Sequence, residues 1–142
     1  SRLHPSGNLG SQLKTVEDLM LTRNKIPFIS ENSKMKNALK VMSSKKLGVL
    51  VVKNKKGLTI GVVTDGDLRR AIQKNKDIKI LTVKNVMTKN PMSIDKNELA
   101  AKALYLMNSK KKITSLCVHN KKNKLKTIGI LHQKMILEAN IQ

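Results

Sequence analysis

The stretch IGVVTDGDLRR, residues 60–70, is the part of the sequence that decides the fold. Strand-forming residues at its start lead into an acidic turn that contains glycine, and two arginines follow. A related stretch, IGILHQKMI, covers residues 128–136. Three further pairs occur in the same order: VEDLM with VKNVM, ALKVM with ALYLM, and LGVLVV with ITSLCV. Since the partners of every pair are about 66 residues apart, the chain is a tandem duplication.

Each copy predicts the same order of elements, β-α-β-β-α. A proline near the start of each copy favours an extended backbone, in residues 26–30 and 91–94. Apolar residues at helical spacing then predict a helix, and these are Met35, Ala38, Leu39 and Met42 in the first copy and Leu99, Ala103, Leu106 and Met107 in the second. Ser33 and Asp95 are expected to cap the two helices.

Two strands and a short helix complete each copy. The predicted ranges are 47–53, 58–64 and 65–74 in the first copy, and 115–119, 127–131 and 133–139 in the second. One copy alone is marginal in size, so the two must bury their sheets together. The predicted fold class is α+β (α/β): two β-α-β-β-α repeats, related by a pseudo-twofold axis and packed through their sheets. Leu50, Val52, Leu116 and Val118 are expected at equivalent core positions.

The composition limits the core and the location of the protein. Of the 142 residues, 39% are hydrophobic but only 1% are aromatic, so Ile, Leu, Val, Met and Ala must build the core. Cys117 is the lone cysteine and lies in an apolar run, which is typical of a protein in the reducing cytoplasm. No apolar run approaches the roughly 20 residues of a membrane span, and the first residues lack a signal peptide. We therefore expect a cytoplasmic protein without a membrane partner.

The net charge of +20 raises the question of a nucleic-acid partner. Among the 29 basic residues, the arginines are only Arg2, Arg23, Arg69 and Arg70. Base readout favours arginine forks, and single-strand binding favours aromatic stacking platforms. Because both are scarce here, we interpret the scattered lysines as solvated surface and expect no specific nucleic-acid partner.

The repeated segments carry a family resemblance. An ALxxM helix followed by a G-h-h-T-x-x-D segment, where h is hydrophobic, resembles the CBS domain. Two such units in tandem resemble a CBS pair, or Bateman module. The resemblance implies one CBS repeat in residues 15–76 and a second in residues 77–142. Residues 1–14 are then a remnant of, or linker from, a preceding domain.

A closer resemblance is to the C-terminal half of the arabinose-5-phosphate isomerases of the Kdo pathway, which serves lipopolysaccharide biosynthesis. HPSGNLG, residues 4–10, is similar to the HPGGxLG segment that ends their sugar-isomerase (SIS) domain, although Ser6 replaces a glycine. TDGDLRR and NVMT, residues 85–88, also match. The resemblance implies that an SIS domain, absent from this chain, interconverts ribulose 5-phosphate and arabinose 5-phosphate in the parent protein. His4 would be catalytic only in that full-length parent.

The same resemblance implies partners for the chain. One is the N-terminal SIS domain of the same parent chain, whose arrangement the CBS pair would regulate. Another is a second copy of the chain, because CBS pairs commonly stack into homodimers. For the parent protein, a tetramer is an alternative.

Thr64 and Asp67 stand three residues apart where a strand meets a helix, and two readings of them stay open. As a T-x-x-D pair, they can cap the helix. As two acceptors near a helix N-terminus, they can also bind a ribose diol, with Arg69 or Arg70 beside the phosphate. The matching residues of CBS domains imply this second role. Further expected ligand contacts are Asp65, Lys46, Lys112, Thr114 and Ser115, the last three from across the pseudo-twofold axis.

In the second copy, His132 and Met135 stand at the places of Thr64 and Asp67. Since Met135 cannot accept from a diol, we expect one nucleotide site per chain at most. The candidate ligands are AMP, ATP, CMP and CMP-Kdo, and no cofactor is required. No metal site is expected, because His119 and His132 lack cysteine or carboxylate neighbours. The alternative function is a structural dimerisation module with an empty cleft.

Overall fold

The chain folds as two compact units, which a computed structural model describes for residues 10, 12–74, 77–109 and 112–141. The first-repeat unit is Asn24–Pro91. The second-repeat unit joins Met92–Gln142 to the N-terminal residues Ser1–Arg23. Helices and two sheets make up these units, so the mixed α/β class predicted from the sequence is confirmed.

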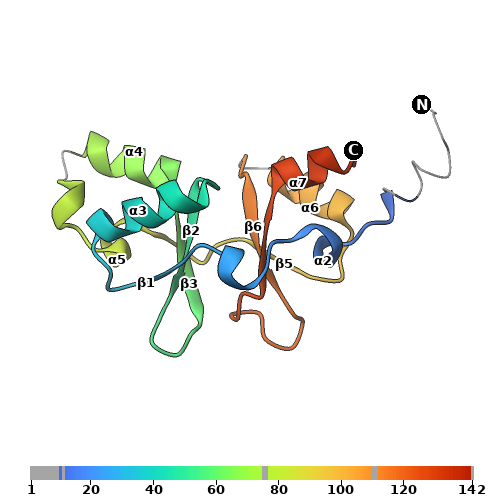
Figure 1. The fold of residues 1–142 in the computed structure, drawn as a ribbon, viewed down its shortest axis with the longest axis horizontal. Coiled ribbons are helices and arrows are strands. Elements are labelled where there is room, and N and C mark those ends of the chain that lie inside the picture. Colours follow the sequence, from blue (N-terminus) through green and yellow to red (C-terminus); the bar gives the residue numbers. More distant parts are fainter. Residues whose placement is uncertain (1–9, 11, 75–76, 110–111, 142) are drawn as a thin grey trace. The chain divides into compact units, whose positions relative to one another are not determined.

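A four-stranded sheet organises the first-repeat unit (Figure 1). Its strand order is β1-β2-β3-β4, with β1 parallel to β2 and the other pairs antiparallel. The strands are β1 Phe28–Ser30, β2 Val49–Lys53, β3 Thr59–Thr64 and β4 Thr88–Lys89. The helices are α3 Met35–Lys45, α4 Asp65–Gln73 and α5 Val83–Val86, with short 3₁₀ turns η1 Arg23–Lys25 and η2 Ile78–Ile80.

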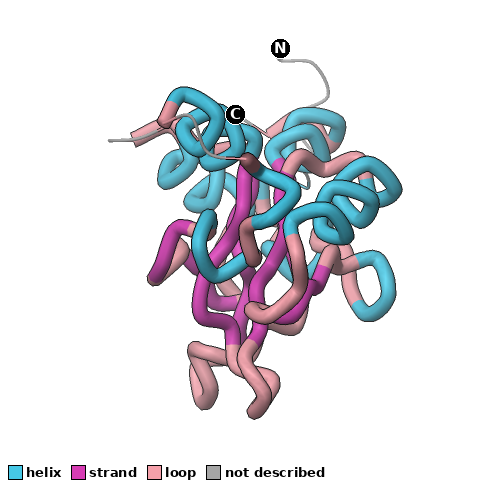
Figure 2. The backbone as a smooth tube through the Cα atoms, turned by 90° about the vertical axis from the view of Figure 1, so that its left-hand side faces the viewer, coloured by secondary structure: helices cyan, strands magenta, loops and turns pink. Residues whose placement is uncertain are grey.

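A three-stranded sheet organises the second-repeat unit, in the order β5-β6-β7. Again the first pair is parallel and the second antiparallel. The strands are β5 Ser93–Asp95, β6 Ser115–His119 and β7 Gly129–His132. The helices are α2 Val16–Leu19, α6 Ala100–Met107 and α7 Gln133–Glu138. In each unit, the loop of the antiparallel hairpin lies at the opposite end of the strands from the two longer helices (Figures 1 and 2).

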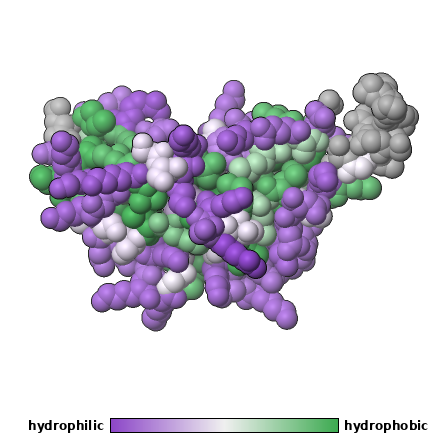
Figure 3. Space-filling view, in the orientation of Figure 1, coloured by the Kyte–Doolittle hydropathy of each residue, from purple (hydrophilic) through white to green (hydrophobic). Residues whose placement is uncertain are grey.

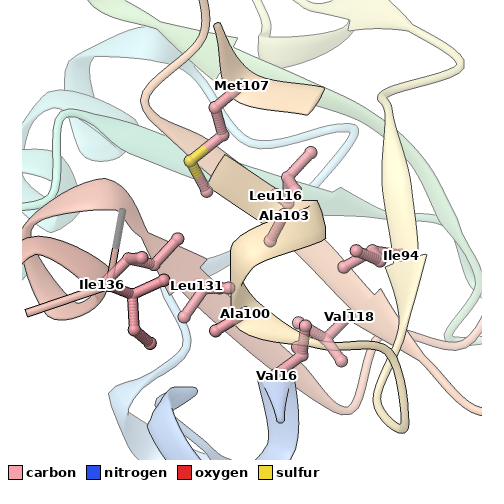
Figure 4. Packing of buried hydrophobic residues seen from close by; sticks show 10 residues of the cluster. Val16, Ile94, Ala100, Ala103, Met107, Leu116, Val118, Leu131 and Ile136 are labelled. Atoms are coloured by element: carbon pink, nitrogen blue, oxygen red, sulfur yellow. The ribbon is translucent and has the colours of Figure 1, made fainter. Parts of the chain in front are cut away.

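Each unit has its own apolar core. Leu50, Val52, Leu116 and Val118 are all fully buried, as predicted. The first core contains Met35, Ala38, Met42, Leu50, Val52, Val63, Val83 and Val86. The second contains Val16, Ile94, Ala100, Ala103, Met107, Leu116, Val118, Leu131, Ile136 and Ile141 (Figure 4). Cys117 is buried as well, and this burial raises the pKa of its thiol to about 11.

Most predicted elements occur within a few residues of their expected ranges, and the start of β2 shows why they differ. The strand begins at Val49 rather than at residue 47. Lys46 ends α3 in the left-handed conformation, with φ 59°, and Gly48 follows with φ 68°. A left-handed backbone can continue neither a helix nor a strand, so the strand starts only after the glycine.

The predicted caps Ser33 and Asp95 are wrong. The N-cap residues are Lys34 for α3 and Leu99 for α6, and neither makes a side-chain capping hydrogen bond. Asp95 instead lies in β5, where its Oδ1 accepts from the backbone N–H of Asn97 at 2.8 Å. Spacing along the sequence suggested a local cap, but the helix starts are satisfied by backbone groups from distant segments.

Those distant segments are the two lead segments, residues 14–21 and 81–88, which are counterparts in the duplication. The carbonyl of Leu81 accepts from Met35 N at 2.8 Å, at the start of α3. In the same way, the carbonyl of Lys14 accepts from Ala100 N at 2.9 Å, at the start of α6. Each lead segment therefore precedes one copy in the sequence but closes the helix of the other copy.

The lead segments also extend both sheets at a glycine. A Cβ on Gly61 of β3 would lie 2.7 Å from Met87 Sδ and 2.8 Å from the carbonyl oxygen of Thr88. In the other unit, a Cβ on Gly129 would meet the side chain of Met20. Only glycine leaves room for the methionine and the backbone to approach so closely.

The surface and the described helices can be compared with the expectation that the protein has no membrane partner. Hydrophilic side chains cover much of the face shown in Figure 3. Within the described residues, no helix combines the length and the apolar character that crossing a membrane requires.

Replacing Val16 by alanine tests the exchange of lead segments. Val16 is fully buried in the second-repeat unit although it precedes the first copy (Figure 4). Val16→Ala should therefore destabilise β6 and β7 by about 2–3 kcal/mol through the cavity it leaves. The matched change Val83→Ala should destabilise β2 and β3 instead, because Val83 is fully buried in the other core. Peptide-resolved hydrogen-deuterium exchange measures both effects. If Val16→Ala destabilised β2 and β3 instead, the lead segments would not be exchanged between the copies.

Candidate functional site

Thr64 and Asp67 form a capping box at the start of α4. The backbone N–H of Asp67 donates to Thr64 Oγ1 at 3.3 Å, and the N–H of Thr64 donates to Asp67 Oδ2 at 2.8 Å. The Thr64 hydroxyl also donates to Oδ2, at 3.0 Å. The capping reading of this pair is thereby confirmed.

The second carboxylate oxygen of Asp67 has two further partners. Arg70 Nη2 donates to Oδ1 at 2.6 Å, and the hydroxyl of Thr88 in β4 donates to the same oxygen at 2.6 Å. The Asp67 side chain is only 4% exposed, whereas that of Arg70 is 60% exposed. A carboxylate has about four lone-pair sites, so the internal donors use the full acceptor capacity of Asp67.

A surface pocket of about 520 Å³ lies beside this carboxylate, inside the first-repeat unit. Its lining is Asp67, Arg70 and Ala71 of α4, the C-cap Lys74, and Leu81, Asn85, Val86, Met87 and Thr88 of the lead segment. Apolar side chains thus stand next to one acidic, two basic and two neutral polar groups. This combination suits a ligand that has an apolar face, hydroxyl donors and a negative charge.

The other predicted contacts of the first-repeat unit stand near the start of α4 or on the surface. A Cβ on Gly48 would lie 3.0 Å from Asp65 Oδ2, so the Asp65 carboxylate lies over the start of β2. Arg69 and Lys46 are exposed. The structure therefore brings together Thr64, Asp67 and Arg70.

The remaining predicted residues lie elsewhere. Lys112 and Thr114 are exposed in the second-repeat unit, where Thr114 O accepts from Gln133 N at 2.8 Å. Ser115 Oγ is buried and has no hydrogen-bond partner among the described residues. Whether these three residues join Thr64 and Asp67 stays a prediction. His4 falls outside the described residues.

Thr88 is the residue that reasoning from the sequence missed. It belonged to the quoted NVMT motif, but only as a mark of family resemblance. The signal that could have found it is the match of VEDLM with VKNVM, which placed the same short segment before each copy. What the sequence lacked was the pairing of β4 with β3, in which Thr88 stands opposite Val62.

In the second-repeat unit, the equivalent positions lack this polar arrangement. His132 is the N-cap of α7, and its Nδ1 accepts from the backbone N–H of Lys134 at 3.1 Å. Met135 packs against the apolar core. Leu21 pairs with Ile130 as Thr88 pairs with Val62, so an aliphatic side chain replaces the hydroxyl.

No group of three or more His, Cys, Asp or Glu side chains in the described part of the chain could hold a metal ion. Two buried groups of the second-repeat unit, Asp95 Oδ2 and His119 Nδ1, have no hydrogen-bond partner there. They stand on neighbouring strands, since Asp95 pairs with His119 in the register of β5 and β6.

The stability of the second-repeat unit should fall below pH 6.5 because of His132. Burial, and then the charge of Lys134, lower the pKa of His132 from its ordinary value of 6.5. The neutral ring that caps α7 is fully retained above 6.5, and its stabilisation is lost as the pH falls through the lowered value. Urea unfolding measured at several pH values should show this loss. His132→Asn keeps an acceptor but does not titrate, so an identical pH dependence in that variant would refute the explanation.

Removal of the Asp67 carboxylate should destabilise the first-repeat unit by about 2–3 kcal/mol, because a cap and a buried acceptor are lost together. Asp18 offers a matched control. It forms the same capping box with Thr15, but it is exposed, and the N–H of Thr15 lowers its pKa. Asp18→Ala should therefore cost less than Asp67→Ala in urea unfolding. Equal losses would mean that the bonds from Arg70 and Thr88 contribute nothing.

Comparison with protein families and with known proteins identifies relatives of this chain. The family model of the CBS domain matches residues 16–74 and 83–141. The chain is 34% identical over 139 residues to the arabinose 5-phosphate isomerase KdsD of Escherichia coli strain K12, covering 97% of this chain and 41% of that protein. With the KdsD of Francisella tularensis it shares 37% identity over 136 residues, covering 95% and 41%. The chain thus spans less than half the length of these relatives.

Solved structures show the same architecture. A complex of CBSX2 with AMP has a TM-score of 0.74 and 26% identity, covering 89% of this chain and 96% of that chain. An uncharacterized conserved protein from Pyrococcus horikoshii has a TM-score of 0.79 and 23% identity, covering 92% and 95%. The second likeness concerns the fold alone.

Proposed function

Since this chain belongs to the CBS-domain family, with two copies in tandem, we propose that it is a regulatory module that binds a nucleotide or nucleotide-sugar at Thr64 and Asp67. The single observation that carries the proposal is the buried Asp67 carboxylate. It already accepts from two hydroxyl groups and one guanidinium at the edge of a pocket. A ribose diol offers the same kind of donor.

The nature of the pocket defines the ligand class. Hydroxyl groups of the ligand donate to Asp67, and a phosphate lies near Arg70 and Lys74, which both line the pocket. AMP, ATP, CMP and CMP-Kdo all carry both features. The AMP complex of CBSX2, which is 26% identical to this chain, supports a nucleotide in a related fold. Arg69, Asp65, Lys46, Lys112, Thr114 and Ser115 are further proposed contacts.

We further propose that the parent protein is an arabinose-5-phosphate isomerase of the cytoplasm, acting in Kdo and lipopolysaccharide biosynthesis. The identity of 34% to KdsD over nearly the whole chain supports this parent. More than half of KdsD lies outside the match, which leaves room for an SIS domain there. Within that parent, His4 would stand near the catalytic site. The CBS pair would form a homodimer and regulate the isomerase through different ligand affinities of two states.

A structural dimerisation module with an empty cleft is the second candidate, and one observation favours it. The four acceptor sites of Asp67 are all used by internal donors. Such a carboxylate can stabilise the folded state without any ligand. Nucleotide titration separates the two functions, because only the regulatory module binds.

Asp67→Ala should weaken nucleotide binding roughly tenfold to hundredfold, because the hydrogen bond to the ligand is lost together with the ion pair that holds Arg70 at the pocket. Isothermal titration of the folded chain with AMP, ATP, CMP and CMP-Kdo measures the effect. Met135→Ala, at the equivalent position of the second copy, should leave affinity nearly unchanged. A 2′,3′-dideoxy nucleotide that binds as tightly as its parent would exclude diol recognition, and no binding by the unaltered chain would favour the structural module.

A further inference from the structure

We propose that the Thr88 hydroxyl is an internal substitute for a ligand hydroxyl, so that a nucleotide must displace it from Asp67 and thereby release strand β4. The inference rests on the proposed nucleotide site and adds a regulatory mechanism to it. Thr88 lines the pocket and donates to Asp67 Oδ1 at 2.6 Å, across 21 residues of sequence.

The saturation of Asp67 makes a displacement necessary. Oδ2 accepts from the N–H and the hydroxyl of Thr64, while Oδ1 accepts from Arg70 and Thr88. About four acceptor sites exist on a carboxylate, and all four are taken. A ribose hydroxyl can therefore bind to Asp67 only after one of the internal donors leaves.

Thr88 is the donor that leaves with the least cost. The backbone N–H and the hydroxyl of Thr64 both belong to the capping box at the start of α4, so neither can leave without opening the cap. Arg70 is itself charged and forms an ion pair with Asp67, an attraction that a neutral hydroxyl does not add to its hydrogen bond. The Thr88 hydroxyl is neutral, and Thr88 is exposed in a strand of two residues. Exchange of one neutral hydroxyl for another keeps the number of hydrogen bonds to Asp67 unchanged.

Displacement of Thr88 would loosen β4 and the chain that follows. Two residue pairs join β4 to β3, Gly61 with Lys89 and Val62 with Thr88. The bond from Thr88 to Asp67 is the side-chain tie that adds to this short pairing. After Lys89, only Asn90 and Pro91 precede Met92, where the chain returns to the second-repeat unit. A ligand at Asp67 thus acts on one of the two places where the chain passes between the units, the other being Arg23 to Asn24. By linkage, a stiffer β4 weakens ligand binding.

The second-repeat unit contains a built-in control. Leu21 pairs with Ile130 through two backbone bonds of 2.9 Å, as Thr88 stands opposite Val62. At the place of Asp67 this unit has Met135, and at the place of Thr88 it has Leu21, so no hydroxyl-to-carboxylate bond forms between them. A nucleotide should therefore change hydrogen exchange at Thr88 and Lys89 but not at Leu21.

The test is Thr88→Val, which removes the hydroxyl and keeps the branched shape, with Thr88→Ser as the control that retains the hydroxyl. Titrated with AMP and CMP, Thr88→Val should bind about tenfold more tightly than the unaltered chain, and Thr88→Ser should bind like it. Nucleotide should also speed hydrogen exchange in β4 of the unaltered chain. Tighter binding by Thr88→Val supports the mechanism even if the unaltered chain binds too weakly to measure.

Two results would overturn the mechanism in distinguishable ways. If the unaltered chain binds nucleotide and Thr88→Val binds equally or more weakly, the displacement is wrong and the nucleotide site stands. If neither protein binds any of the nucleotides, the proposed function fails and the displacement fails with it. A measurement without ligand is independent of both binding results. A double-mutant cycle of Thr88→Val and Asp67→Asn in urea unfolding should show coupling, and additive effects would refute the hydrogen bond between Thr88 and Asp67 as a stabilising contact.

Discussion

The hydrogen bonds between each lead segment and the opposite repeat are the constraint on which the rest of the structure depends. Leu81 O closes the start of α3, and Lys14 O closes the start of α6. The first amides of a helix have no partner within the helix, so buried helix starts need acceptors from outside. Here those acceptors come from segments that precede the other copy. Neither copy is complete without the lead segment that precedes the other copy in the sequence. The two copies are therefore coupled to each other.

The same exchange brings Thr88 to Asp67 and so creates the candidate site. A carboxylate that is almost fully buried is costly unless hydrogen bonds replace its water. Thr64 and Arg70 come from Asp67's own turn and helix, but Thr88 arrives with the lead segment. The cap, the pocket and the sheet edge at β4 therefore share one charged group. A ligand that competes for this group necessarily acts on all three.

Asymmetry between the copies decides where such competition can occur. Both units use the residue that ends the second hairpin strand as the N-cap of the helix that follows, Thr64 before α4 and His132 before α7. Only the first unit adds the carboxylate, whereas the second fills the equivalent place with Met135 and its apolar core. Duplication kept the backbone arrangement, including the glycines that admit Met87 and Met20, while the polar chemistry remained in a single copy.

The sequence by itself determined the duplication, the mixed α/β class, the approximate ranges of the longer helices and strands, and the pair of Thr64 and Asp67. These features rest on local periodicity and on side chains three residues apart, which a linear pattern contains. The caps at Ser33 and Asp95 were wrong, and Thr88 was missed, for a common reason. In each case, the true partner is a group far away in the sequence, and only tertiary structure brings it within hydrogen-bonding distance. Long-range pairing of β4 with β3, which no local pattern encodes, decided which hydroxyl meets Asp67.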